Sequence, residues 1–171
     1  PSFGKSFICL DDKINKEIIK YIKNKNFYTY GTNPKSNFFI QKIRQDKKFT
    51  EFDLVVKVSN RRRILIKKIR IPLLGIHNVR NSAAAIAVSW TIGISISEIK
   101  KGLLDFKGVQ RRFNKIFTYN EVDFFDDYAH HPTEIKVVLD GVKNVYNNYE
   151  KICIFQPHRI SRLKDLKKEF T

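Results

Sequence analysis

Apolar residues recur along the chain in two rhythms, and the change of rhythm predicts the order of its elements. A short apolar run at 5–10 is followed by a stretch at 12–25 in which Ile14 and Ile18 lie one helical turn apart, and a second apolar run follows at 27–31. Helical spacing between two extended runs predicts a strand–helix–strand unit at the beginning of the sequence.

Three segments then alternate between apolar and polar positions. They span 38–45, 51–59 and 63–71, and Pro72 follows the third. Alternation of period two, interrupted by polar turns, is typical of half-buried strands joined by hairpins. We therefore expect a small antiparallel sheet here.

Two helices are predicted next. The stretch 75–93 repeats apolar residues at three- and four-residue steps and ends at Gly93, a favoured C-cap residue. Ser95 and Glu98 have the spacing of a capping box, which predicts a second helix that ends by Gly108. We expect this helix to turn three apolar residues inward: Ile99, Leu103 and Phe106.

The remaining sequence has the pattern of an α/β unit. A strand is predicted at 122–128, a helix at 132–146 and another strand at 151–155, and a further helix is expected at 158–170. A strand, a crossover helix and a second strand predict a parallel βαβ unit. The polar stretch before it places a domain boundary between 107 and 108, so the predicted fold class is α/β with domains 1–107 and 108–171.

Of the 171 residues, 42% are hydrophobic, which is ordinary for a globular protein. No run of about 18 apolar residues occurs, so a membrane-spanning segment is not expected. Cys9 and Cys153 each lie in a β-like apolar run, and nothing suggests a disulfide, which favours a reducing cytoplasm. The net charge of +16 raises the alternative of a nucleic-acid-binding module. The basic residues are scattered, however, and the densest run, 60–68, has the pattern of a solvated edge strand.

Ionisable side chains follow the predicted strand at 122–128. In a parallel sheet, ligands bind beyond the carboxyl ends of the strands, so this loop and the one after 151–155 should lie side by side. The two loops carry the following residues: Asp126, Asp127, Tyr128, His130 and His131, then Gln156, His158, Arg159 and Arg162. Each acid taken alone has an equal alternative as a turn or helix cap, and a zinc site is disfavoured because it gives the arginines no role.

Asn78 and Asn81 lie three residues apart near the start of the helix at 75–93. They share one helix face, and a primary amide offers both the donor and the acceptor that are needed to bind the edge of an adenine. The alternative is structural: Asn78 as a cap and Asn81 as a surface residue.

Four motifs together resemble one family, the Mur ligases of peptidoglycan synthesis. They are GIHNVRNSAAAIAV at 75–88, FKGVQRRF at 106–113, DDYAHHPTE at 126–134 and FQPHRISR at 155–162. The resemblance implies the end of a central P-loop-type ATPase domain at 1–107 and the beginning of a Rossmann-like C-terminal domain at 108–171. It also implies an ATP- and Mg²⁺-dependent reaction through an acyl phosphate, with UDP-N-acetylmuramate and L-alanine as substrates.

Roles carried over by the resemblance divide the site in two. Asn78 and Asn81 would bind the adenine, Arg112 would reach the nucleotide from the domain junction, and Asp127 would hold the ribose. The amino-acid side would be formed by four residues: Tyr128, His130, Arg159 and Arg162.

Some parts of the family pattern do not occur in the sequence. The glycine-rich phosphate loop, the Mg²⁺ ligands and the domain that holds the UDP group are absent, so we expect this chain to be a fragment that is inactive alone. Within the family, a murein-peptide recycling ligase is an alternative, which the motif at 155–162 disfavours.

Overall fold

The computed structural model describes residues 4–23, 26–57, 62–109 and 111–170. The chain divides into two compact units, Pro1–Lys107 and Gly108–Thr171. Each unit is described by itself.

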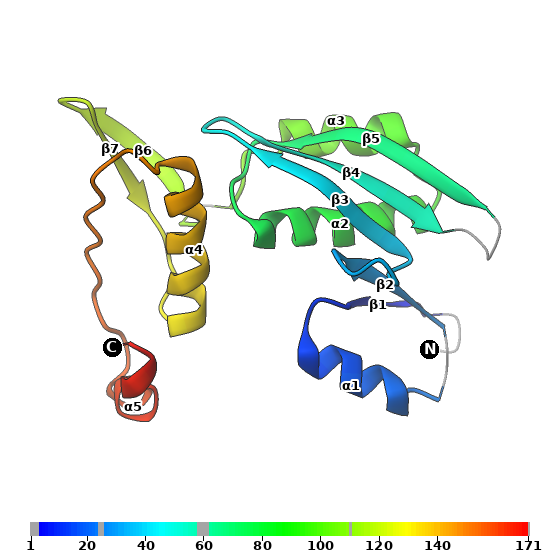
Figure 1. Ribbon diagram of the computed structural model, residues 1–171, viewed down its shortest axis with the longest axis horizontal. Helices are drawn as coiled ribbons and strands as arrows, with labels where there is room; N and C mark the ends of the chain where they lie inside the picture. The colour runs from blue at the N-terminus through cyan, green and yellow to red at the C-terminus, as the bar shows by residue number, and fades with distance from the viewer. Residues whose placement is uncertain (1–3, 24–25, 58–61, 110, 171) are drawn as a thin grey trace. The chain divides into compact units, whose positions relative to one another are not determined.

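The first unit is built on one mixed five-stranded sheet with the order β1-β2-β3-β4-β5 (Figure 1). Strand β1 (Ser6–Cys9), helix α1 (Lys13–Tyr21) and strand β2 (Phe27–Gly31) form the expected strand–helix–strand unit, and the two strands are parallel. Asp12 is the N-cap of the helix, and its side chain accepts a hydrogen bond from the Asn15 amide. The predicted helix extended to 25, whereas α1 ends at Tyr21, and residues 24 and 25 lie outside the described residues.

The antiparallel part of the sheet is confirmed. It consists of β3 (Phe38–Gln45), β4 (Thr50–Lys57) and β5 (Arg63–Ile71), each antiparallel to the next. A short parallel contact, in which Tyr30 pairs with Phe38, joins β3 to β2, so these strands extend the parallel pair instead of forming a separate sheet. In the basic run at 60–68, residues 60 and 61 lie outside the described residues, residue 62 precedes β5, and residues 63–68 are the first part of β5.

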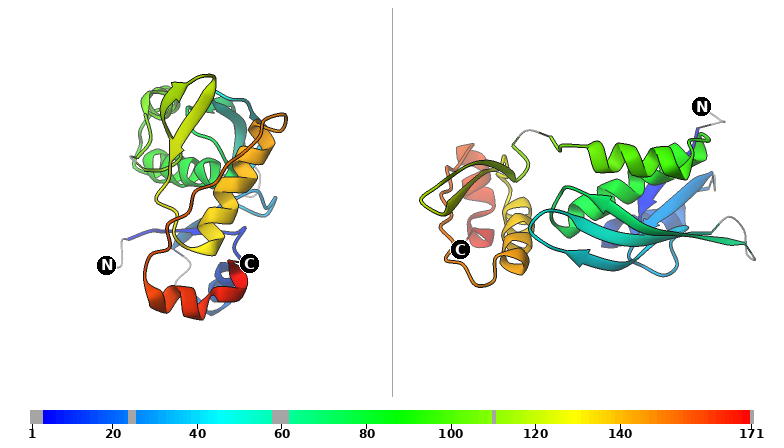
Figure 2. Two further views of the ribbon diagram at one scale, coloured as in Figure 1. Left: turned by 90° about the vertical axis from the view of Figure 1, so that its left-hand side faces the viewer. Right: turned by 90° about the horizontal axis from the view of Figure 1, so that it is seen from above.

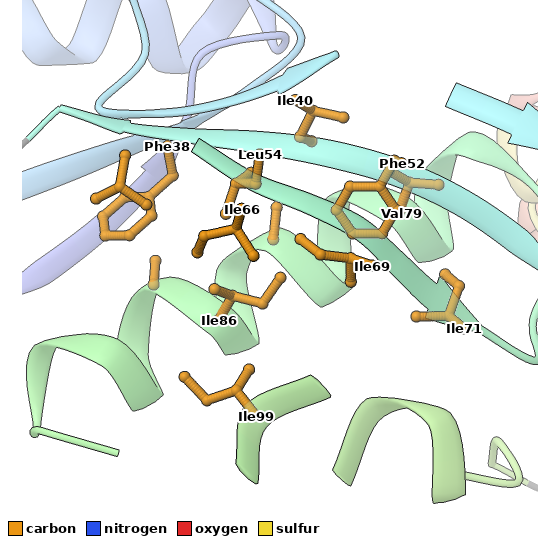
Figure 3. Close-up of a cluster of buried hydrophobic side chains, with 13 residues drawn as sticks. Phe38, Ile40, Phe52, Leu54, Ile66, Ile69, Ile71, Val79, Ile86 and Ile99 are labelled. Carbon is orange, nitrogen blue, oxygen red and sulfur yellow. The ribbon is translucent and has the colours of Figure 1, made fainter. Parts of the chain in front are cut away.

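Two helices pack against one face of this sheet (Figures 1 and 2), and both were predicted. They are α2 (Ile76–Thr91) and α3 (Ile96–Asp105). Every second side chain of β4 is buried against them, as the alternation predicted. Figure 3 shows the resulting core, whose largest fully buried side chains are Phe38, Phe52, Ile40, Leu54, Ile69, Ile71 and Ile86.

The capping box of α3 is present, because the Ser95 hydroxyl accepts from the Glu98 amide and the Glu98 carboxylate accepts from the Ser95 amide. The prediction that Phe106 faces the core is wrong, since its side chain is 45% exposed. The helix ends at Asp105, and Phe106 has an extended backbone with ψ 108°, which takes its side chain out of the apolar stripe.

The second unit contains a two-stranded antiparallel hairpin and two helices. The hairpin consists of β6 (Asn114–Tyr119) and β7 (Val122–Asp126), and it is followed by α4 (Pro132–Val145) and α5 (Ile160–Asp165). A short 3-10 helix, η1 (Lys167–Glu169), ends the described chain. Strand β7 and helix α4 confirm the predictions at 122–128 and 132–146, whereas β6 was not predicted.

The strand predicted at 151–155 does not form, and with it the parallel βαβ unit is absent from the described residues. The Ile152 and Ile154 side chains are 85% and 93% exposed, and Cys153 is exposed as well. A strand exists only where a neighbouring strand completes its hydrogen bonds, and among the described residues β7 pairs with β6 alone. An apolar run therefore indicates a strand without ensuring that a partner is in place.

None of the helices in the described ranges is long and apolar enough to cross a membrane.

Candidate functional site

The first group of candidate residues lies at the beginning of α2. Gly75 is the N-cap with φ 92°, a value that suits glycine, and its amide donates to the side-chain oxygen of Gln45 at the end of β3 (2.8 Å). The side-chain nitrogen of Asn78 donates to the Leu74 carbonyl (2.7 Å), whereas the Asn81 side chain is exposed and makes no hydrogen bond to the described residues. The structure thus commits part of the Asn78 side chain to the first turn and leaves that of Asn81 accessible.

An ion pair that the sequence did not suggest is made by the same helix, α2, on its other flank. Arg80 Nε donates to Asp11 Oδ2 at 2.7 Å, and the Asp11 side chain is only 7% exposed. Asp11 also accepts hydrogen bonds from the Thr32 and Asn33 amides, which follow β2. Burial by itself raises the pKa of Asp11, but the hydrogen bonds from Thr32 and Arg80 outweigh it, so the pKa is lowered and the group is a carboxylate.

The second group lies between β7 and α4. Both oxygens of Asp127 accept from backbone amides: Oδ2 from Phe113 (2.7 Å) and Oδ1 from Ala129 (2.6 Å). This carboxylate therefore fixes the local turn, which is the structural alternative that the sequence left open. Each carboxylate oxygen can accept a second hydrogen bond, so Asp127 retains capacity for a ligand.

Tyr128 and His130 form a pair at this loop. Their rings meet edge to face with centroids 5.1 Å apart, and the Tyr128 side chain is exposed. His130 Nδ1 lies 2.9 Å from the Tyr128 carbonyl oxygen. A carbonyl can only accept, so Nδ1 carries the hydrogen in this contact and the neutral ring has its free lone pair on Nε2.

Glu134 joins the loop to the residue expected at the domain junction. Its carboxylate accepts from the His130 and His131 amides (3.2 and 3.4 Å) and lies 3.9 Å from Arg112. Burial raises the pKa of Glu134. The hydrogen bonds from the two amides, and then the charges of His130 and Arg112, lower it by more, so the net pKa lies below its ordinary value. The sequence analysis did not identify this contact, although Glu134 follows His131, the N-cap of α4, at the spacing of a capping box.

The third group, Arg159 and Arg162, lies at the beginning of α5. Arg159 is the exposed N-cap residue with φ 69°, and Arg162 contacts the His158 carbonyl at the limit of hydrogen-bonding distance, 3.5 Å. No hydrogen bond or ion pair joins either arginine to the loop at 126–134 within the described part of this unit. The expectation that two strand ends bring these loops together depended on the strand at 151–155, so the structure does not support it.

Across the described ranges, no three His, Cys, Asp or Glu side chains lie close enough to hold a metal ion.

Comparison with known proteins identifies the class. Residues 1–89 match the Mur ligase middle domain, and residues 111–171 match the Mur ligase, glutamate ligase domain. The first match alone covers more than half of the chain, and the fold agrees with that of solved Mur ligases. The chain belongs to the Mur ligase family.

The curated relatives point to one member of the family. The chain is 65% identical over its whole length to the UDP-N-acetylmuramate–L-alanine ligase of Pelagibacter ubique and 42% identical over 99% of its length to that of Brachyspira hyodysenteriae. It spans 37% and 36% of these two proteins.

Solved structures support the fold. The UDP-N-acetylmuramate–alanine ligase of Thermotoga maritima has a TM-score of 0.68 at 29% identity, with 82% of this chain and 32% of that chain covered. A murein peptide ligase of Psychrobacter arcticus has a TM-score of 0.54 at 30% identity, with 84% and 29% covered.

Proposed function

We propose that the chain forms part of an ATP-dependent ligase that joins L-alanine to UDP-N-acetylmuramate in the cytoplasm, a step of peptidoglycan synthesis that cell shape and cell division require. The observation that carries this proposal is the 65% identity to the Pelagibacter ubique ligase, which extends over all 171 residues. In this proposal, residues 1–107 are the C-terminal part of the central ATP-binding domain and residues 108–171 the N-terminal part of the C-terminal domain.

The reaction has two chemical steps. A carboxylate oxygen of the muramic acid attacks the γ-phosphorus of ATP, ADP leaves, and an acyl phosphate forms. The alanine nitrogen then attacks the acyl carbon, phosphate leaves, and the nitrogen loses a proton as the amide forms. Mg²⁺ would offset the phosphate charge, and we assign its ligands outside this chain.

Adenine recognition is assigned to α2. Asn81 presents an exposed amide, and Asn78 retains its amide oxygen as an acceptor after its nitrogen has bonded to Leu74. On the ribose side, the assignment is Asp127, which has unused acceptor capacity, together with Arg112, whose side chain is 56% exposed.

The amino-acid side is assigned to the loop before α4 and the beginning of α5. His130 is suited to accept the proton that the attacking amine loses, because the Tyr128 carbonyl keeps hydrogen on Nδ1 and leaves Nε2 as the base. Exposed Tyr128 shields one side of the imidazole ring. Arg159 and Arg162 are assigned to the alanine carboxylate, which paired guanidinium donors bind well.

A hybrid enzyme tests the function. These 171 residues would replace the matching 37% of the Pelagibacter ubique ligase, and phosphate release from ATP would be measured with Mg²⁺ and UDP-N-acetylmuramate. We expect release that requires L-alanine, and we expect none from the 171-residue chain alone. The unaltered ligase is the positive control, and a hybrid that is well folded but releases no phosphate with L-alanine would refute the assignment.

Phosphate release with murein tripeptide in place of L-alanine would instead favour the recycling ligase. The 30% identity to the Psychrobacter arcticus enzyme is the reason to test this alternative. The nucleic-acid alternative predicts tight, strongly salt-dependent binding to DNA or RNA. The structure favours the solvated edge strand instead, because β5, which contains residues 63–68 of the basic run, lies at the edge of the sheet.

A further inference from the structure

The Asp11 carboxylate connects three segments that are distant in the sequence. It follows β1, it accepts from the Thr32 amide (2.9 Å) and the Asn33 amide (3.1 Å) beyond β2, and it pairs with Arg80 of α2 at 2.7 Å. Such charge-assisted hydrogen bonds are about twice as strong as neutral ones, and this carboxylate is 7% exposed, where water competes little. The beginning of α2 is therefore attached to the carboxyl ends of both parallel strands.

The position of Arg80 on α2 places this attachment away from the candidate adenine side chains. Successive residues of an α-helix are about 100° apart, so Arg80 lies about 200° around the axis from Asn78. The buried side of the helix, with Val79 and Ala83, lies between them. Arg80 thus holds one flank of α2, while Asn78 and Asn81 lie beyond the other.

Gly31 shows that the strand end is shaped around this carboxylate. A Cβ atom at Gly31 would lie 2.6 Å from Asp11 Oδ1. The Gly31 backbone also has φ 140°, a conformation that residues other than glycine rarely adopt. Glycine at this position both permits the backbone turn into Thr32 and makes room for Asp11. Two separate features of the sequence therefore support the same contact.

We propose that the Asp11–Arg80 ion pair is a positioning device that sets the orientation of the first turns of α2, and through it the placement of Asn78 and Asn81. Its role in nucleotide affinity depends on the function proposed above, because only then do these asparagines bind adenine. Neither Asp11 nor Arg80 touches the nucleotide in this proposal. Their loss changes affinity for ATP by loosening the helix that carries the binding side chains.

The first test uses the 171-residue chain and hydrogen exchange. Arg80→Gln should raise exchange of the α2 backbone amides at 80–83 by about tenfold, while amides of β4 stay protected. Arg70→Gln is the matched control, because it removes a guanidinium that also pairs at 2.7 Å, with Glu51 on the sheet. Equal exchange at 80–83 in the two variants, or a uniform rise across the whole unit, would overturn the proposal.

Two further variants separate positioning from a failure to fold. Arg80→Lys keeps the charge and should restore most of the protection, whereas Gly31→Ala displaces the Asp11 carboxylate and should loosen the same amides. Fluorescence of Trp90, the single tryptophan, verifies that each variant retains its core. Loosening by Gly31→Ala at sites other than 80–83 would contradict the proposal.

The second test measures kinetics in the hybrid ligase. Arg80→Gln should raise the KM for ATP about tenfold and leave kcat within about twofold, and Arg70→Gln should change neither. An active hybrid with an unchanged KM would refute the positioning role and leave the function intact. A hybrid that is inactive before any substitution would refute the function and the role in affinity, and hydrogen exchange alone would then decide the structural role.

Discussion

Strand β4 gives the sharpest test of how the sequence determines the first unit. It is the strand between β3 and β5, and its side chains alternate between the buried and the less buried face. Leu54 is 0% exposed and lies between Ile40 and Ile66, which are both buried. Val55, the next residue, points to the other face, where its neighbour Leu65 is 44% exposed.

The expected cost of truncation follows from this difference in burial. Leu54→Ala removes a fully buried side chain and leaves a cavity between two strands and α2, which should lower the free energy of unfolding by about 3 kcal/mol. Val55→Ala removes two methyl groups that are partly in water already, so its cost should be about 1 kcal/mol. The losses of unfolding free energy for Leu54→Ala and Val55→Ala should therefore differ by about 2 kcal/mol, although the two residues are adjacent in the sequence.

Trp90 makes this difference measurable for the first unit alone. It is the single tryptophan, and its ring lies edge to face against Phe38 with centroids 5.9 Å apart. With a urea dependence of about 2 kcal/mol per M, Leu54→Ala should lower the unfolding midpoint by about 1.5 M and Val55→Ala by about 0.5 M. Equal shifts would show that the register of β4 is wrong, because one face would then be no more buried than the other.

Three other predictions follow from the described contacts. Asp11 has a lowered pKa, so its contribution to stability is present above the unfolded value of about 4 and is lost as the pH falls through the folded value. Asp11→Asn should therefore flatten the decline in the Trp90 unfolding midpoint between about pH 5 and 2. Glu121 has φ 64° in the β6–β7 turn, so Glu121→Gly should stabilise the hairpin by about 0.5–1 kcal/mol, measured by hydrogen exchange of β7. In the hybrid ligase, Arg162→Ala should raise the KM for L-alanine about tenfold or more with little change in the KM for ATP, and an unchanged KM for L-alanine would remove Arg162 from the proposed site.

Local patterns predicted the first unit well because its elements are determined by neighbouring residues. The helical spacing at 75–93 reflects one face that is buried in the structure. The alternation at 38–45 and 63–71 holds only in part, because Lys42 and Lys68 have positive φ where the register with β4 shifts. Phe106 is one exception, since the apolar spacing continued past Asp105, where the helix ends. Ile14 and Ile18 of α1 are others, because they are 70% and 49% exposed. Periodicity identifies a face but does not fix the last turn of a helix.

The candidate site was predictable only where its contacts are local. The capping arrangement of His131 and Glu134 spans three residues and is visible in the sequence. The pairing of Asp11 with Arg80 spans 69 residues, and no periodicity or motif connects them. A carboxylate after a strand and an arginine on a helix are each ordinary, and only the fold shows that they form one buried contact.

The segment 151–155 shows why a correct local pattern can lead to a wrong topology. Its sequence, KICIF, has strong strand propensity, yet Ile152 and Ile154 are exposed and no strand forms. A parallel strand gains its stability from hydrogen bonds to a neighbour and from burial of both faces, so the preference of the segment itself is only a small part of the free energy. Strand β7 pairs with β6, which a two-residue turn at Asn120 and Glu121 brings beside it. Such a short connection costs little chain entropy, whereas a strand at 151–155 would have to reach the other edge of β7 across the intervening helix α4.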